Sequence, residues 1–165
     1  MPDWISPSVL KDILLSMLAL YGAVLSTFNY TQSVRKERRS VVVSLSTAMP
    51  TYGAIVGDCF AKIEAINAGH RPVTISTLAL EVPEGQRLFS TGSGGAPGMS
   101  DTQLPISLAD GQSAQVFFSY KAIGDTLVRY GCTQKIKLTP ICEDSFGTVY
   151  KGKLWEVDPQ QLVRM

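Results

Sequence analysis

The strongest pattern in the chain is an uninterrupted hydrophobic run near its start. Residues 13–34 carry no charged side chain, and apolar residues occur nearly all round a helical projection of the run. Ser6 and Pro7 precede the run as a helix N-cap and a first helical residue. These 22 residues would span roughly 33 Å as a helix, which matches a bilayer core about 30 Å thick. The pattern predicts that residues 1–34 form one hydrophobic helix that crosses a membrane once.

A second interpretation of this helix is burial inside a protein assembly instead of lipid. Small side chains at spacings of three and four form a stripe along it, and these are Ser16, Ala19, Gly22, Ala23 and Ser26. In lipid, such a stripe lets two helices approach closely. Small residues are also common in membrane helices in general. The sequence therefore leaves open whether the protein forms a homo-oligomer through this helix.

From residue 40 onward the pattern changes from helical to alternating. Short runs with hydrophobic residues at every second position are separated by turn signals such as Asp110-Gly111. One short helix is expected over 122–130, and a bulge is expected near Thr77-Leu78, where the alternation slips. Strands are expected over 41–46, 59–65, 73–82, 87–90, 104–108, 115–120, 134–142 and 148–157.

About seven or eight short strands at this spacing are typical of an all-β sandwich. The predicted fold class is therefore mainly β, with an Ig-like β-sandwich domain over residues 40–165 after one long hydrophobic N-terminal α-helix. The likeness is architectural only. An antibody domain places a Trp between two paired cysteines, whereas Trp155 follows all three cysteines of this chain.

A basic cluster directly follows the hydrophobic run and forms a juxtamembrane segment, residues 35–39. Its membrane-orienting side chains are Arg35, Lys36, Arg38 and Arg39. By the positive-inside rule, this cluster predicts a single-pass membrane protein whose β-domain lies on the cytoplasmic side. The order also argues against a cleaved secretory signal, in which basic residues precede the apolar run. The same side chains are suited to membrane lipid, because they can contact anionic head groups.

Composition excludes several classes of partner and site. The net charge is +1, so no global field attracts nucleic acid, and no nucleic-acid partner is expected. Cys59, Cys132 and Cys142 are interpreted as reduced, small, mostly buried hydrophobes. A disulfide from Cys142 to Cys59 or Cys132 stays open for an oxidising compartment. One histidine and three scattered cysteines do not suggest a zinc site.

A Cys–His pair is the one catalytic arrangement that the sequence makes conceivable. His70 follows Cys59 by eleven residues across a turn, although an exposed turn histidine is the favoured interpretation. The glycines of 92–98 lack the Gly-Lys-Ser/Thr ending of a phosphate-binding loop. Residues 143–145 are interpreted as a solvated hairpin turn instead of a cation site. We therefore expect no catalytic residue, no cofactor and no metal ligand.

Several segments together resemble a known type of protein. An apolar helix and a basic stop are followed by VVVSLS, and then by IEAINAGHRPVTISTLAL, LPISLADGQSAQVFFSY and DSFGTVYKGKLW. This order resembles uncharacterised bacterial membrane-anchored proteins with an N-terminal transmembrane helix and an Ig-like β-sandwich domain, over nearly the whole chain. The resemblance implies a fold and an anchor, and it brings no catalytic residues. Fold alone does not give function.

The function that the sequence predicts is a membrane-tethered interaction module that binds a protein partner without catalysis. Long irregular segments on rigid scaffolds often carry binding, and residues 91–103 are the longest such segment. We expect this loop and the edges of the sandwich to contact the partner. The alternative is a structural or accessory subunit whose hydrophobic helix packs inside a protein complex.

Overall fold

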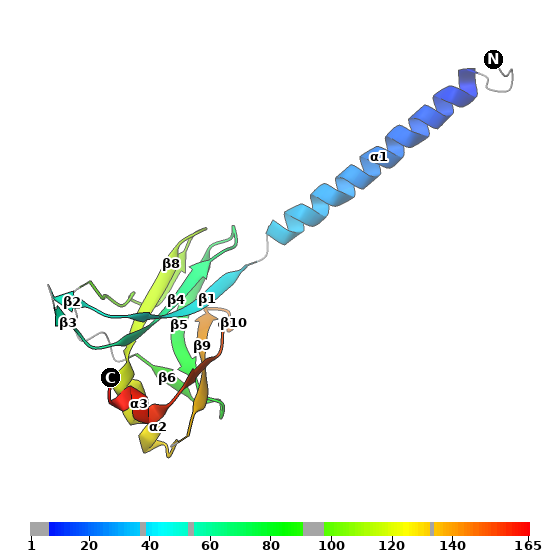
Figure 1. Ribbon diagram of the computed structural model, residues 1–165. Helices are drawn as coiled ribbons and strands as arrows, with labels where there is room; N and C mark the ends of the chain where they lie inside the picture. The colour runs from blue at the N-terminus through cyan, green and yellow to red at the C-terminus, as the bar shows by residue number, and fades with distance from the viewer. Residues whose placement is uncertain (1–6, 37–38, 53–54, 91–97, 133) are drawn as a thin grey trace. The chain divides into compact units, whose positions relative to one another are not determined.

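The computed structural model describes the chain apart from residues 1–6, 37–38, 53–54, 91–97 and 133. Internal contacts divide the chain into two compact units, Met1–Arg38 and Arg39–Met165. The first is helical and the second is mainly β (Figure 1). Each unit is built on the periodicity that its own part of the sequence carries.

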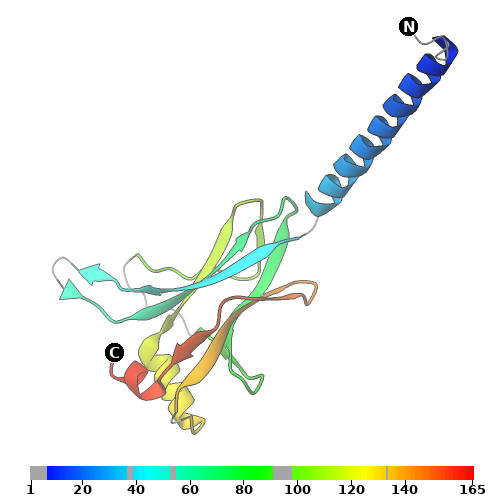
Figure 2. The same ribbon diagram turned by 45° about the vertical axis from the view of Figure 1, so that its right-hand side comes forward.

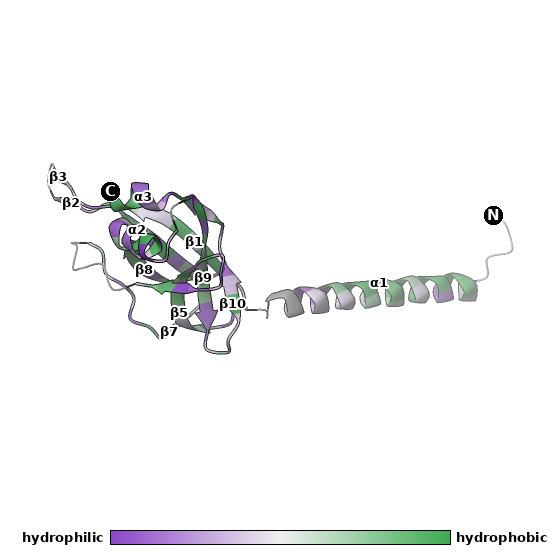
Figure 3. Cartoon of the chain, turned by 90° about the horizontal axis from the view of Figure 1, so that it is seen from below, coloured by the Kyte–Doolittle hydropathy of each residue, from purple (hydrophilic) through white to green (hydrophobic). Residues whose placement is uncertain are grey.

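Over its described residues the first unit is one helix, α1 (Pro7–Lys36). Apolar residues lie along most of its length (Figure 3). The segment Val9–Ser33 is long and apolar enough to cross a membrane, and none of it is buried inside the protein. Its 25 residues would span about 38 Å, which exceeds a core of about 30 Å and fits a tilted helix. The expected long hydrophobic helix is present, and it continues two residues beyond residue 34.

The second unit begins with a sheet of three antiparallel strands in the order β1-β4-β8. These strands are β1 (Val41–Ala48), β4 (Phe60–Asn67) and β8 (Ser113–Ser119). The central strand β4 pairs with β1 along eight positions and with β8 along seven. Its alternation is as predicted, because Ala61, Ile63 and Ala65 are fully buried while Lys62 and Glu64 form an ion pair on the other face.

The second sheet has the order β10-β9-β5-β6, with two further short strands at its edges. Its strands are β5 (Val73–Glu81), β6 (Arg87–Phe89), β7 (Ile106–Leu108), β9 (Ile136–Asp144), β10 (Val149–Lys151) and β11 (Trp155–Val157). β6 and β7 pair with different ends of β5, and β10 and β11 pair with different ends of β9. Each outer edge of this sheet is therefore formed by two short strands, which pair with different ends of the same neighbouring strand. The pairing of β5 with β9 shifts between Ile75 and Thr77, which confirms the predicted bulge.

One hydrophobic core lies between the two sheets. Ile63 and Val116 reach it from the first sheet, and Ile75, Leu80 and Leu138 reach it from the second. Burying each such side chain stabilises the fold by about 1.5–3 kcal/mol. Within the second unit, the sheets are therefore held together by apolar contacts across the interior.

Two helices pack side by side in the second unit, at the end remote from the start of β1 (Figures 1 and 2). They are α2 (Tyr120–Arg129) and α3 (Pro159–Val163). Their backbones approach closely at Gly124, where an added Cβ would lie 2.8 Å from the backbone nitrogen of Val163. α2 lies where a helix was predicted, whereas α3 was not predicted.

The number of strands differs from the sequence prediction. The described residues form eleven strands instead of seven or eight. Two of them, β2 (Thr51–Tyr52) and β3 (Ile55–Val56), pair only with each other in a small hairpin that was not predicted. If each split edge is taken as one strand, the two sheets contain seven strand positions. The difference arises from the β2–β3 hairpin, which was not predicted, and from the run 148–157, which forms the two strands β10 and β11 instead of one.

Candidate functional site

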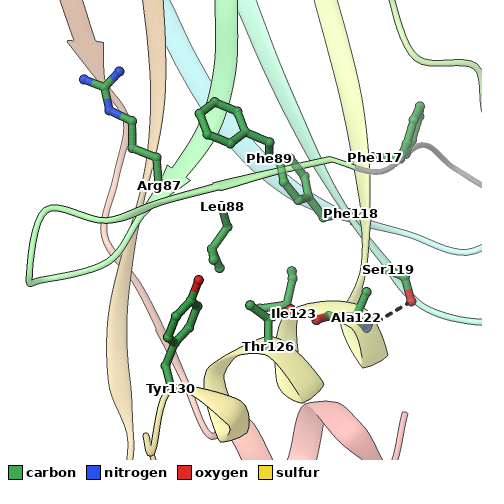
Figure 4. A pocket seen from close by; sticks show the side chains of 10 residues that line it. All are labelled: Arg87, Leu88, Phe89, Phe117, Phe118, Ser119, Ala122, Ile123, Thr126 and Tyr130. Carbon is green, nitrogen blue, oxygen red and sulfur yellow. Dashed lines mark hydrogen bonds between the residues drawn. The ribbon is translucent and has the colours of Figure 1, made fainter.

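A cleft of ≈ 310 Å³ opens between β6 and α2, at the end of the second unit where the two helices lie. Figure 4 shows side chains from β6, from the end of β8 and from α2 converging on it. Its walls are mostly aromatic and aliphatic, with three hydroxyl groups and one guanidinium. The lining residues are Arg87, Leu88, Phe89, Phe117, Phe118, Ser119, Ala122, Ile123, Thr126 and Tyr130.

The β6 wall of the cleft is set by the pairing of β6 with β5. Leu88 lies opposite Leu80 and packs against the core, and Figure 4 shows its side chain directed toward α2. Phe89 is the next residue along the strand, where alternation places its side chain on the other face. The Phe89 side chain is 60% exposed. β6 thus fixes one apolar side chain in the core and one large aromatic side chain at the surface.

The opposite wall is the helix α2, whose ends are both capped. Ser119 precedes the helix, and its hydroxyl accepts a hydrogen bond from the amide of Ala122. Ile123 and Leu127 anchor one face of the helix in the core. The helix ends at Tyr130, whose amide donates to the carbonyl of Thr126. Tyr130 is 61% exposed, so both β6 and α2 carry an exposed aromatic side chain among the residues that line the cleft.

The charge within the cleft is already neutralised. The Arg87 guanidinium donates to the Glu143 carboxylate on β9, and both side chains are about one-third exposed or less. The hydroxyl of Ser90, at the foot of β6, donates to the carbonyl of Phe117. None of the lining residues is a cysteine, histidine or carboxylic acid. The cleft therefore offers apolar contact and hydroxyl hydrogen bonds.

A second cavity of ≈ 360 Å³ is lined mainly by β11 and α3, together with Tyr120 at the start of α2 and Thr47 on β1. Tyr120 and Trp155 form part of its wall, with ring centroids 5.4 Å apart, and the Tyr120 hydroxyl lies 2.5 Å from that of Thr47. Cys59 also lines this cavity. A ring contact and a hydrogen bond thus hold the Tyr120 side chain in place, and we interpret both contacts as stabilising the fold.

Cys59 and His70 are not brought together. They flank opposite ends of β4, whose eight residues separate them by about 25 Å. The Nδ1 of His70 instead lies 2.6 Å from the Asp110 carboxylate, and both side chains are more than half exposed. The Cys–His pair that the sequence made conceivable is therefore wrong, and the favoured interpretation of an exposed turn histidine is confirmed.

All three thiols are free. Cys142 is fully buried, and burial, followed by the charge of Asp144, raises the pKa of its thiol from the ordinary value of 9.0 to about 12. Cys59 and Cys132 are half-buried. Burial of a neutral thiol agrees with the interpretation of Cys142 as a small hydrophobic residue.

The turn over 143–145 differs from the solvated turn that was expected. Asp144 is only 2% exposed, and its carboxylate accepts hydrogen bonds from the amides of Phe146 and Thr148 and from the hydroxyl of Tyr150. These bonds compensate for its burial because every donor is directed at the charged group. Within the described parts of the chain, no group of three or more His, Cys, Asp or Glu side chains could hold a metal ion.

The predicted orienting and helix-contact residues lie in or near α1. Arg35 and Lys36 belong to its last turn, and Arg38 lies outside the described residues. Arg39 belongs to the second unit, where its guanidinium carbon lies 4.1 Å from the ring centroid of Phe146. The small residues Ser16, Ala19, Gly22, Ala23 and Ser26 are all exposed on α1. An added Cβ at Gly22 would meet nothing within 4 Å.

One predicted contact surface is occupied by the chain itself. Asp101 and Thr102 lie along the outer edge of β8, where their side chains accept hydrogen bonds from the amides of Phe117 and Gln115. The amide of Thr102 also donates to the carbonyl of Gln115. This edge is therefore closed to a partner strand. Of the predicted contact loop 91–103, residues 91–97 lie outside the described residues, and so does most of the glycine-rich segment 92–98.

Comparison with known proteins returned no matching family model, curated protein or solved structure. The cleft residues were not predicted from the sequence. They come from three separate segments, and Phe89 and Tyr130 are their most exposed aromatic side chains.

Proposed function

We propose that the protein is a membrane-tethered, non-catalytic interaction module that binds a protein partner through the cleft between β6 and α2. The observation that carries the proposal is that two of the residues lining one apolar cleft, Phe89 on β6 and Tyr130 at the end of α2, have largely exposed aromatic side chains. Exposed apolar patches of this kind mark interaction sites, and aromatic residues are enriched in the cores of protein interfaces.

The occupant that best fits the cleft is an apolar side chain of a protein segment. At ≈ 310 Å³ the hollow lies at the lower end of the range for small-molecule sites, which enclose most of their ligand. The side chains of Phe89 and Tyr130 are largely exposed to solvent, so a small ligand in this cleft would be only partly covered. A protein partner would cover the exposed faces of Phe89 and Tyr130 while one of its side chains fills the hollow.

The test compares partner recovery by the full chain and by the double variant F89A/Y130A. The tagged full chain is purified in mild detergent, and co-purifying proteins are quantified by mass spectrometry. Loss of an interface hot spot of about 2 kcal/mol weakens binding about 30-fold, so the double variant should lose the enriched partner. Leu154→Ala is the matched control, because Leu154 is 60% exposed and lies outside the cleft. Equal recovery by the double variant, or no enriched protein with the wild-type chain, would overturn the proposal.

The strand order supports an Ig-like classification of the β unit. Three strands in the order β1-β4-β8 face a sheet whose order is β10-β9-β5-β6, and sequential strands repeatedly cross between the two sheets. Seven strand positions in two antiparallel sheets are typical of Ig-like sandwiches. We offer this as a proposal about architecture, since the fold alone says nothing of the partner.

We also propose that Val9–Ser33 crosses the membrane once and leaves the β unit in the cytoplasm. The length and exposure of α1 and the basic residues after it support this topology. Protease added to spheroplasts should spare the β unit, and digestion from outside would reverse the topology. Extraction by alkaline carbonate without detergent would instead favour the accessory subunit whose helix packs inside a complex.

A further inference from the structure

We propose that the end of the β unit at which β1 begins rests on the surface of the membrane that α1 crosses, with Phe146 and Arg39 in the lipid headgroup layer. This end, here called the turn face, comprises Arg39 and the turns 68–71, 109–112 and 145–147. The proposal rests on the membrane tether of the proposed function and is independent of the cleft.

Phe146 stands at the tip of the turn between β9 and β10. Its side chain is 73% exposed, which is the highest value among the large hydrophobic side chains that the structure describes. The Arg39 guanidinium lies over its ring at 4.1 Å from the centroid. A membrane interface accommodates both groups, because it solvates an aromatic ring and attracts a cation to lipid phosphate. In water, by contrast, the ring remains uncovered on one side.

The turn that carries Phe146 is braced from within the protein. The buried Asp144 carboxylate accepts bonds of 2.9 Å from the Phe146 amide and 2.8 Å from the Thr148 amide. The amide of Ser145 donates to the carbonyl of Thr74 on β5. These bonds fix the backbone of the turn that carries the exposed ring of Phe146. Little conformational freedom is left to be lost when the ring enters lipid.

A second brace at the same end holds the neighbouring turn. Asn67 is fully buried, and its side-chain amide donates to the carbonyls of Arg71 and Leu108 while its oxygen accepts from the amide of Gly69. Asn67 and Asp144 are the two buried polar or charged residues found in the described part of the chain. Both are used to fix turns of the turn face, which makes this end a preformed surface.

The length of the chain keeps the turn face near lipid. Ser33 ends the apolar segment, Lys36 ends α1 and Arg39 begins the β unit. Three helical residues and a link of three residues counted at its greatest possible length reach at most about 15 Å, so Arg39 cannot lie farther than this from the end of the apolar segment. Charge also favours contact. The turn face carries one acidic residue, Asp110, which is paired with His70, against the cations of Arg39 and Arg71.

The cleft lies at the opposite end of the same unit. β9 begins at Ile136, shortly after Tyr130, and ends at Asp144 beside Phe146. Its nine residues extend about 30 Å. This separation provides a matched pair of exposed aromatic positions for a test, one on the turn face and one at the cleft.

The experiment is photo-crosslinking of the full chain in lipid nanodiscs. Photoreactive p-benzoylphenylalanine replaces Phe146, Tyr130 or Phe28 in separate variants, and lipid adducts are quantified by mass spectrometry. Phe28 lies in the apolar segment of α1 and reports the tether itself. Nanodiscs contain phosphatidylcholine alone or an equal mixture with phosphatidylglycerol. We expect several-fold more lipid adduct from position 146 than from position 130. The yield from position 146 should increase further when the nanodiscs contain phosphatidylglycerol, and the substitution Arg39→Gln should abolish this further increase.

The outcomes separate the two proposals. Adducts from position 28 but equally low yields from positions 146 and 130 would overturn the turn face while leaving the tether intact. No lipid adduct from position 28 would overturn the tether and with it this inference. Crosslinking of position 146 to a protein instead of lipid would assign the turn face to a protein partner and would also overturn the proposal.

Discussion

At the scale of single residues, two polar side chains are buried among the described residues of the β unit, Asn67 and Asp144, and both are hydrogen-bonded. No buried side-chain nitrogen or oxygen atom in the described residues lacks a hydrogen-bond partner. The buried charge of Asp144 affects the pKa of neighbouring side chains, because it disfavours a second negative charge nearby. Burial raises the pKa of Tyr150, and the charge and hydrogen bond of Asp144 raise it further.

Alkaline pH should therefore destabilise the fold through Cys142. Its folded-state pKa of about 12 lies above the ordinary value of 9.0, so its contribution to stability is complete below pH 9 and is lost progressively as pH rises toward 12. The urea midpoint of the full chain in detergent should fall from pH 8 to pH 11. Cys142→Ala should show a smaller fall, with Tyr150 supplying a residual one of the same sign. An identical fall in wild type and variant would contradict this assignment.

At the scale of elements, close approaches between backbones decide where elements lie. α2 and α3 meet at Gly124, where a side chain would contact the backbones of Val163 and Pro159 at less than 3.0 Å. Gly152 lies in the link from β10 to β11, where an added Cβ would lie 2.6 Å from the carbonyl oxygen of Val43 on β1. Both glycines are therefore packing residues, since the neighbouring atoms are backbone atoms that cannot turn aside.

Gly124→Ala should destabilise the protein even though alanine favours helices more than glycine does. The methyl group would force α3 away from α2, at a cost of about 1–3 kcal/mol that outweighs a helix-propensity gain of about 1 kcal/mol. Thermal unfolding followed by circular dichroism measures the effect. The control is Lys121→Ala on the exposed face of the same helix, where we expect little change. A more stable Gly124→Ala variant would show that the two helices are free to separate.

The existence of most strands could be predicted from the sequence, whereas their interruptions could not. Alternation located β4 and β5 because burial on one face dictates it. The run 148–157 was predicted as one strand but breaks into β10 and β11, because Gly152 must fit against β1. α3 was missed although Asp158 and Pro159 form a helix start, since the helix has only five residues. The cleft was unpredictable, because Phe89 and Tyr130 are distant in sequence.

At the scale of the whole molecule, the two units are built independently. The core is formed by residues between Val41 and Leu162, and none of the segment Val9–Ser33 is buried. A fragment comprising Arg39–Met165 should therefore fold without α1. Far-UV circular dichroism should be β-rich with a cooperative melt, and the fragment should remain in solution without detergent. A disordered spectrum would show that α1 supports the β unit.

The antiparallel pairing of β1 with β4 has a mechanical consequence. β1 is attached to the anchor at its first residue, and its eight pairs with β4 run from Val41 toward the end that carries the cleft. Tension between the membrane and a partner bound at the cleft would act along β1, so its ladder of hydrogen bonds would be loaded in shear, all together. A strand attached at its other end would peel away one pair at a time. With a partner at the cleft and a tether at β1, the direction of this one strand would therefore make the unit resist being pulled apart.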